Sequence, residues 1–124
     1  MTKKKLFILE DDVITAEMYA HFFSEFFEVS IANNARSFRN YFKNHTPDAA
    51  IIDINIKDSK HDGIYLVQEL KSISHYHTKF IAVTGYQDLK SADLFDGHFK
   101  KPIDLDHLND FIRDQINKES IDTV

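Results

Sequence analysis

The 124-residue sequence predicts an α/β fold with five parallel strands and helices on both faces of the sheet. Three observations lead to this prediction. Short runs of consecutive apolar residues, typical of strands buried on both faces, recur along the chain. Segments with apolar residues at helical spacing alternate with these runs. Several runs end directly at a charged or hydroxyl side chain, as expected where the carboxyl ends of strands line a binding site.

The five predicted strands are short and mostly apolar. The clearest is Ala49–Ile52, in which four small or branched apolar residues in a row lead directly to Asp53. Leu6–Leu9 leads in the same way to Glu10. The remaining predicted strands are Glu28–Ala32, Phe80–Val83 and His98–Lys100.

The segments between the strands carry apolar residues at helical spacing. Asp12, Asn34 and Asp104 precede three of these segments and have side chains that commonly cap helices. The first helix is expected from Ile14 to about Phe27, with a buried stripe of Ile14, Met18 and Phe22, widened by Tyr19, Phe23 and Phe26. The buried faces expected for the other long helices are Phe38, Tyr41 and Phe42; Ile64, Val67, Leu70 and Ile73; and Leu105, Leu108, Phe111, Ile112 and Ile116. One short helix is expected around Leu89 to Leu94.

Length and composition indicate one domain over residues 1–124, with residues 119–124 as a frayed tail. The net charge of −5 argues against a nucleic-acid surface. No apolar run is long enough to cross a bilayer and no signal peptide is visible, so no membrane contact is expected. The absence of cysteine fits a reducing compartment, and the expected location is the cytoplasm.

The candidate site follows from the strand order. The doubly wound, flavodoxin-like order 2-1-3-4-5 suits so compact a chain, and it places Glu10 and Asp11 opposite Asp53 across one cleft. Three converging carboxylates repel one another unless a cation neutralises them, and a hard ion with oxygen ligands, Mg²⁺, is the predicted cofactor. Thr84 ends the fourth strand with a hydroxyl and Lys101 follows the fifth with an ammonium group. Such a set suits the handling of a phosphoryl group.

Four segments that contain these residues resemble the receiver domain of bacterial two-component response regulators, and the resemblance covers essentially the whole chain. The segments are Phe7-Ile8-Leu9-Glu10-Asp11-Asp12, Ile51-Ile52-Asp53-Ile54-Asn55-Ile56, Ala82-Val83-Thr84-Gly85 and Phe99-Lys100-Lys101-Pro102. The resemblance implies a phospho-accepting switch of a two-component system or phosphorelay, rather than a conventional enzyme, with at most slow self-dephosphorylation. Its partners would be a histidine kinase or a histidine phosphotransfer protein and a downstream protein target.

The resemblance also implies a role for each site residue. Asp53 would take the phosphoryl group as an aspartyl phosphate. Asp11 would bind Mg²⁺ directly, Glu10 would support the ion through water, and the backbone carbonyl of Asn55 would be a further ligand. Thr84 and Lys101 would bind phosphoryl oxygens and move inward on phosphorylation. Asp12 is assigned to helix capping, and the Lys101–Pro102 peptide bond is expected to be cis, as in similar proteins.

Two regions depart from the family pattern. The motif glycine, Gly63, comes ten places after Asp53 instead of eight, so the loop from Lys57 to Asp62 carries about two extra residues. Sixteen residues separate Thr84 from Lys101, fewer than is usual, so the helix between them should be short or irregular.

Two side chains in or next to the shortened segment carry hypotheses of their own. His98 stands where the family usually has Tyr or Phe. This raises the hypothesis of a pH-sensitive output, with an exposed or hydrogen-bonded histidine as the alternative. Tyr86, two places after Thr84, is a candidate shield of the acyl phosphate.

Other functions remain open at this point. A receiver-like protein-binding module, whose output is largely independent of phosphorylation, would suit the altered output region. One or two exposed rings in the Phe22–Phe27 segment would serve kinase docking or a homodimer contact. A flavodoxin-like enzyme is disfavoured because acids follow the first strand, where a phosphate-cradling loop is needed. A dehalogenase-like enzyme is disfavoured because Asn55 stands where it needs an acid.

Overall fold

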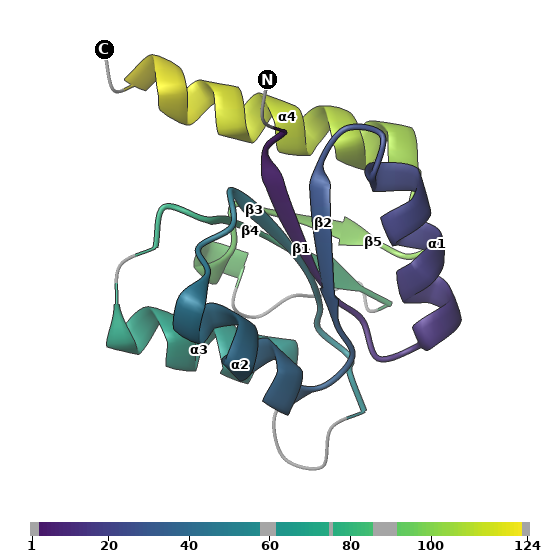
Figure 1. The fold of residues 1–124 in the computed structure, drawn as a ribbon, viewed down its shortest axis with the longest axis vertical. Coiled ribbons are helices and arrows are strands. Elements are labelled where there is room, and N and C mark those ends of the chain that lie inside the picture. The colour runs from purple at the N-terminus through teal and green to yellow at the C-terminus, as the bar shows by residue number, and fades with distance from the viewer. Residues whose placement is uncertain (1–2, 58–61, 75, 86–91, 123–124) are drawn as a thin grey trace.

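The computed structural model describes residues 3–57, 62–74, 76–85 and 92–122, which form a single parallel sheet with helices on both faces (Figure 1). The strand order is β2-β1-β3-β4-β5, and every pairing is parallel, as predicted. The strands are β1 (Lys5–Leu9), β2 (Glu28–Ala32), β3 (Ala49–Asp53), β4 (Lys79–Thr84) and β5 (Gly97–Lys100).

Four α-helices cover the sheet in two pairs. They are α1 (Val13–Phe23), α2 (Ala35–Asn44), α3 (Gly63–Ile73) and α4 (Leu105–Asp122). Helices α2 and α3 lie on one face, and α1 and α4 lie on the other (Figure 1). The fold class inferred from the sequence, an α/β sheet of the flavodoxin-like type, is therefore confirmed.

Strand β3 is buried along its whole length and supplies side chains to both cores. Ala50 and Ile52 pack in the core beneath α2 and α3, whereas Ala49 and Ile51 pack in the core beneath α1 and α4. This alternation follows from the twofold period of a strand, because successive side chains point to opposite faces of the sheet. Asp53 thus ends a strand that is fixed from both sides.

The predicted N-caps are present. The carboxylate of Asp12 accepts a hydrogen bond from the backbone N–H of Thr15 at 3.2 Å, and the side chain of Asn34 accepts one from Ser37 at 2.8 Å. Asp104 accepts one from His107 at 3.2 Å. These bonds satisfy backbone donors that have no partner inside the helix, so each side chain fixes the residue at which its helix begins.

The predicted buried face of α1 is partly wrong. Ile14 and Met18 are 78% and 54% exposed, whereas Ala16, Tyr19 and Phe23 are buried. The helix also ends at Phe23 instead of continuing to about Phe27. Apolar residues occur all around this helix, so hydropathy could not identify the side that packs on the sheet.

The structure also revises two helix ends. Ile73, predicted to be buried, is 75% exposed because it occupies the last residue of α3, beyond the buried Leu70. Helix α4 continues to Asp122, so residues 119–122 are helical where a frayed tail was expected. Residues 123–124 lie outside the described part of the chain.

Between β4 and β5 the described residues form only a three-residue 3₁₀ helix, η1 (Ala92–Leu94). This agrees with the prediction of a short or irregular helix. The Nζ atom of Lys71 donates to the carbonyl of Leu94, and the carboxylate of Asp96 accepts from the N–H of Phe80 at 2.9 Å. These bonds hold the segment before β5 against α3 and β4.

Three further predictions about this half of the chain have different outcomes. The Lys101–Pro102 peptide bond is cis, as expected. His98 is exposed on β5, and its pH hypothesis stays a prediction. Tyr86 and the residues from Leu89 to Ser91 lie outside the described residues. Within the described ranges, none of the helices combines the length and the apolar character required to span a bilayer.

Candidate functional site

The site lies where the carboxyl ends of β1, β3, β4 and β5 meet. Backbone hydrogen bonds continue past the strands at this end of the sheet: Ile54 donates to the carbonyl of Val83 at 2.9 Å, and Lys101 donates to that of Thr84 at 2.9 Å. Glu10 donates to the carbonyl of Ala32 at 3.0 Å. These bonds fix the backbone of the segments that carry the candidate site residues.

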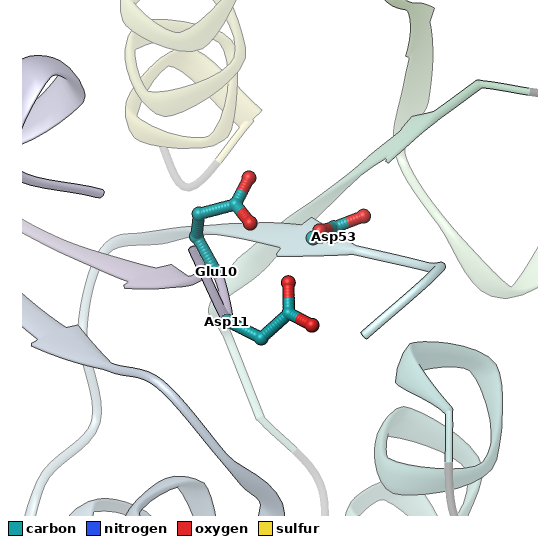
Figure 2. A group of neighbouring side chains, drawn as sticks. All are labelled: Glu10, Asp11 and Asp53. Carbon is teal, nitrogen blue, oxygen red and sulfur yellow. The ribbon is translucent and has the colours of Figure 1, made fainter. Parts of the chain in front are cut away.

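Three acids gather at this edge, as predicted. One carboxylate oxygen from each of Glu10, Asp11 and Asp53 lies within 4.8 Å of the others (Figure 2). Glu10 and Asp53 are buried, and Asp11 is half-buried. Among the described residues this is the one group of three acids or histidines so closely placed.

The ammonium group of Lys101 faces two of the acids. The Nζ atom of Lys101 lies 3.4 Å from Oδ2 of Asp53 and 3.8 Å from Oε1 of Glu10. The lysine side chain is about one-third exposed, whereas both carboxylates are buried. Among the ion pairs of the described residues, Lys101 is the cation within 4 Å of this cluster of three acids, which leaves the cluster short of positive charge.

The electrostatic strain falls most heavily on Glu10. Burial is the largest cause that raises the pKa of its carboxyl group to about 7. The backbone N–H of Asp12 acts in the opposite direction, because it donates to Oε2 at 3.1 Å and so favours the charged form. The neighbouring carboxylate of Asp53 raises the pKa further, and Lys101 partly offsets it. The buried Oε1 atom of Glu10 has no hydrogen-bond partner among the described residues. A cation in the cleft would satisfy this oxygen.

The donor set fits Mg²⁺. The acids open into a cleft of about 510 Å³, whose lining residues are Glu10, Asp11, Asp12, Thr15, Asp53, Asn55, Lys57 and Lys101. Its metal-binding candidates are oxygen atoms, the ligand type that Mg²⁺ prefers, and the cleft has room for the water that this ion retains. The lack of a hydrogen-bond partner for Oε1 of Glu10 among the described residues is consistent with such an ion.

Asn55 is placed at the cleft, and its side chain makes contacts that the sequence did not reveal. Its backbone N–H donates to Oδ1 of Asp53 at 3.0 Å. Its side-chain oxygen Oδ1 accepts from the Thr84 hydroxyl at 3.3 Å and from the N–H of Gly85 at 3.2 Å. From the sequence, Asn55 had a predicted role through its backbone carbonyl alone. The signal available in the sequence was a polar side chain only two positions after Asp53.

Two further contacts shape the cleft. The carboxylate of Asp11 accepts from the backbone N–H of Lys57 at 2.8 Å, which ties the segment after β3 to the end of β1. Asp12 lines the cleft but lies outside the acid cluster and caps α1, as predicted. Hydrogen bonds from Thr15 lower the pKa of the Asp12 carboxyl group.

Gly63 brings α3 against the backbone of β3. A Cβ atom at this position would lie 2.7 Å from the carbonyl oxygen of Asp53 and 2.8 Å from the side chain of Ile52. No side chain fits there, so glycine permits the close approach of the helix. The backbone of Asp53 is therefore packed against α3, and its side chain lines the polar cleft.

The comparisons with known proteins concern the family and the fold of the chain. A family model described as the response regulator receiver domain matches residues 6–113. No curated protein sequence matches the chain significantly.

Solved structures of receiver domains share the fold. A CheY-like receiver domain from Methylobacillus flagellatus has 24% sequence identity and a TM-score of 0.82, with 92% of this chain and 99% of that one covered. A CheY-like receiver domain from Methanospirillum hungatei JF-1 has 23% sequence identity and a TM-score of 0.81, with 98% of this chain and 99% of that one covered. The BeF3-activated receiver domain of DrrB has 16% identity and a TM-score of 0.79, with 94% and 99% covered.

Proposed function

Because the chain belongs to the response regulator receiver family, we propose that it accepts a phosphoryl group on Asp53 and thereby switches its contacts with other proteins. One observation carries the proposal. The buried Asp53 carboxylate lies within 4.8 Å of two other acids and 3.4 Å from an ammonium group, at the open end of a parallel sheet. This arrangement supplies a nucleophile and the charges that a phosphoryl group requires.

The proposed reaction is a group transfer. A carboxylate oxygen of Asp53 attacks phosphorus, the bond between phosphorus and the donor's histidine nitrogen breaks, and the bonding electron pair remains on the imidazole. The site residues neutralise charge: Lys101 donates to phosphoryl oxygens, and the Thr84 hydroxyl donates to another. Mg²⁺, when held by Glu10, Asp11, Asp53 and the carbonyl of Asn55, would neutralise phosphoryl oxygen charge.

The product would act through its charge. The phosphoryl group of the aspartyl phosphate would carry about −1.5 to −2 charges, in place of the single negative charge of the Asp53 carboxylate. Lys101 and Thr84 are then attracted towards the phosphoryl group, and their displacement changes the surface next to β4 and β5. In this proposal the chain is a switch with at most slow self-dephosphorylation, and a phosphorylation-independent binding module is not favoured.

The surface around the cleft fits a protein donor. Val13, Ile14 and Met18 of α1 are each more than half exposed, and α1 begins directly after the cleft residue Asp12. Apolar side chains at such a position favour a docked protein surface. We therefore propose a histidine kinase or a histidine phosphotransfer protein as the donor, a cytoplasmic location and one receiver domain over the chain.

The test is phosphorylation with a small phosphodonor, acetyl phosphate, in Mg²⁺, followed by intact-protein mass spectrometry. The wild type should gain one phosphoryl group, and Asp53→Asn should gain none. Asp114→Asn, which removes an exposed acid on α4, is the matched control and should be labelled like the wild type. Equal labelling of Asp53→Asn and the wild type would exclude Asp53 as the acceptor.

A further inference from the structure

The side chain of Asn55 joins the ends of two neighbouring strands. It belongs to the turn after β3, yet its Oδ1 atom accepts hydrogen bonds from two donors at the end of β4. The donors are the hydroxyl of Thr84, at 3.3 Å, and the backbone N–H of Gly85, at 3.2 Å. An amide oxygen has two lone pairs, so this one acceptor serves both donors.

The bond to Thr84 competes with the role proposed for that hydroxyl. A threonine hydroxyl has one hydrogen and donates it to one acceptor at a time. Among the contacts of the described residues the acceptor is Oδ1 of Asn55, whereas in the phosphorylated form it would be a phosphoryl oxygen. The hydrogen bond from Thr84 to Asn55 must therefore break when the hydroxyl turns to the phosphoryl group.

We propose that Asn55 is a positioning residue whose side chain holds the Thr84 hydroxyl in the unphosphorylated arrangement and so opposes the switch. The inference rests on the proposed function of Asp53. A contact biases an equilibrium only if it differs between the two states. The bond to Thr84 meets this condition, because the hydroxyl cannot donate to Asn55 and to the phosphoryl group together.

A simple structural tether would behave differently. If Asn55 served only to hold the turn after β3 in place, its contacts would be equal in both states. Removal of its side chain would then lower the free energy of unfolding and leave the affinity for a phosphoryl mimic unchanged, or weaken it. The proposal requires the opposite change in affinity, since the lost contact stabilises the unliganded arrangement.

The experiment titrates beryllofluoride, a phosphoryl mimic, into the full chain in saturating Mg²⁺ and follows binding by ¹H–¹⁵N NMR. Asn55→Ala should bind about threefold to tenfold more tightly than the wild type, the change expected for the loss of one neutral hydrogen bond. Asn55→Leu, which keeps the size of the side chain without an acceptor, should behave in the same way. A Mg²⁺ titration of each variant without beryllofluoride separates any effect on the metal.

Thr84→Val provides the control for the mechanism. It removes the hydroxyl at nearly constant shape, so Asn55→Ala should cause no further tightening in the Thr84→Val background. In the wild type, the Gly85 amide proton should move downfield on beryllofluoride binding, because it becomes the remaining donor to Oδ1 of Asn55. This signal requires no substitution and remains informative if a variant folds poorly.

The outcomes separate this inference from the proposed function. If the wild type does not bind beryllofluoride, or Asp53→Asn binds it equally well, the proposed function fails. If the wild type binds it and Asp53→Asn does not, but Asn55→Ala and Asn55→Leu bind with unchanged or weaker affinity, the role of Asn55 fails. Equal tightening in the Thr84→Val background would also overturn it, since the effect would not depend on the hydroxyl.

Discussion

The substitution Glu10→Gln should change how the stability of the protein depends on pH. Burial raises the pKa of the Glu10 carboxyl group to about 7 in the folded chain, from an ordinary value of 4.5. Below pH 4.5 the group is protonated in both states and contributes no difference. Between 4.5 and about 7 the unfolded chain releases the proton while the folded chain retains it, so stability falls as pH rises.

The size of the effect follows from the two pKa values. The difference between 4.5 and about 7, at about 1.4 kcal/mol for each pKa unit, corresponds to about 3 kcal/mol of lost stability above pH 7. The amide of Glu10→Gln does not titrate. The variant should therefore be about as stable as the wild type near pH 4 and more stable by up to about 3 kcal/mol near pH 8.

The assay is urea unfolding of both proteins at these two pH values, without and with Mg²⁺. In the proposed function Mg²⁺ would bind the ionised carboxylates, so it should raise the stability of the wild type near pH 8 more than that of Glu10→Gln. Asp114→Asn, an exposed acid on α4, should follow the wild type at both pH values. An identical pH dependence for Glu10→Gln and the wild type would show that burial of Glu10 is not the source of the strain.

Two further predictions concern packing away from the acids. Gly63→Ala should lower the free energy of unfolding by about 1–3 kcal/mol, because its Cβ atom would lie 2.7 Å from a β3 carbonyl oxygen. Urea unfolding measures this change. The control Gly85→Ala should leave the free energy of unfolding unchanged, because its Cβ atom would meet nothing within 4 Å, and equal losses of stability for both variants would contradict the argument. Lys71→Met should lower stability by about 1 kcal/mol and speed amide exchange around Leu94, because it removes the bond from Nζ to that carbonyl. Unchanged exchange there would show that the bond does not hold the segment.

The fold was predictable because its signals are local. Ala49–Ile52 is apolar without interruption, and a short strand of this kind fits the middle of a parallel sheet. The capping side chains of Asp12 and Asn34 correctly marked the starts of two helices. Alternation of these strands and helices was then sufficient to select the doubly wound sheet.

The side of α1 that packs on the sheet was not predictable from hydropathy. Ile14 and Met18 are more hydrophobic than Ala16 and Tyr19, yet they are the exposed residues. Asp12, which lines the cleft, caps the helix, and the buried Ala16, Tyr19 and Phe23 define the side that meets the sheet. Which side packs is a tertiary effect that the hydropathy of this helix does not contain.

The positions of the acids and of Lys101 in the candidate site were predictable, whereas the contacts of the Asn55 side chain were not. The acids and Lys101 follow strands directly, so the strand order was enough to bring them together. The side-chain contacts of Asn55 were not foreseen. They join residues 29 and 30 positions apart in the sequence and depend on the relative height of two strand ends, which local patterns do not encode.

The placement of β3 between two cores has a consequence for how this chain can vary in length. Side chains along Ala49–Ile52 alternate between the two cores, so a one-residue insertion or deletion inside the strand would move the side chains beyond it to the opposite face and remove Asp53 from its position. Insertions and deletions in the connections carry no such penalty. Length changes should therefore accumulate in the segments after Asp53 and Thr84. The surroundings of the cleft can then diversify while Asp53 stays in register.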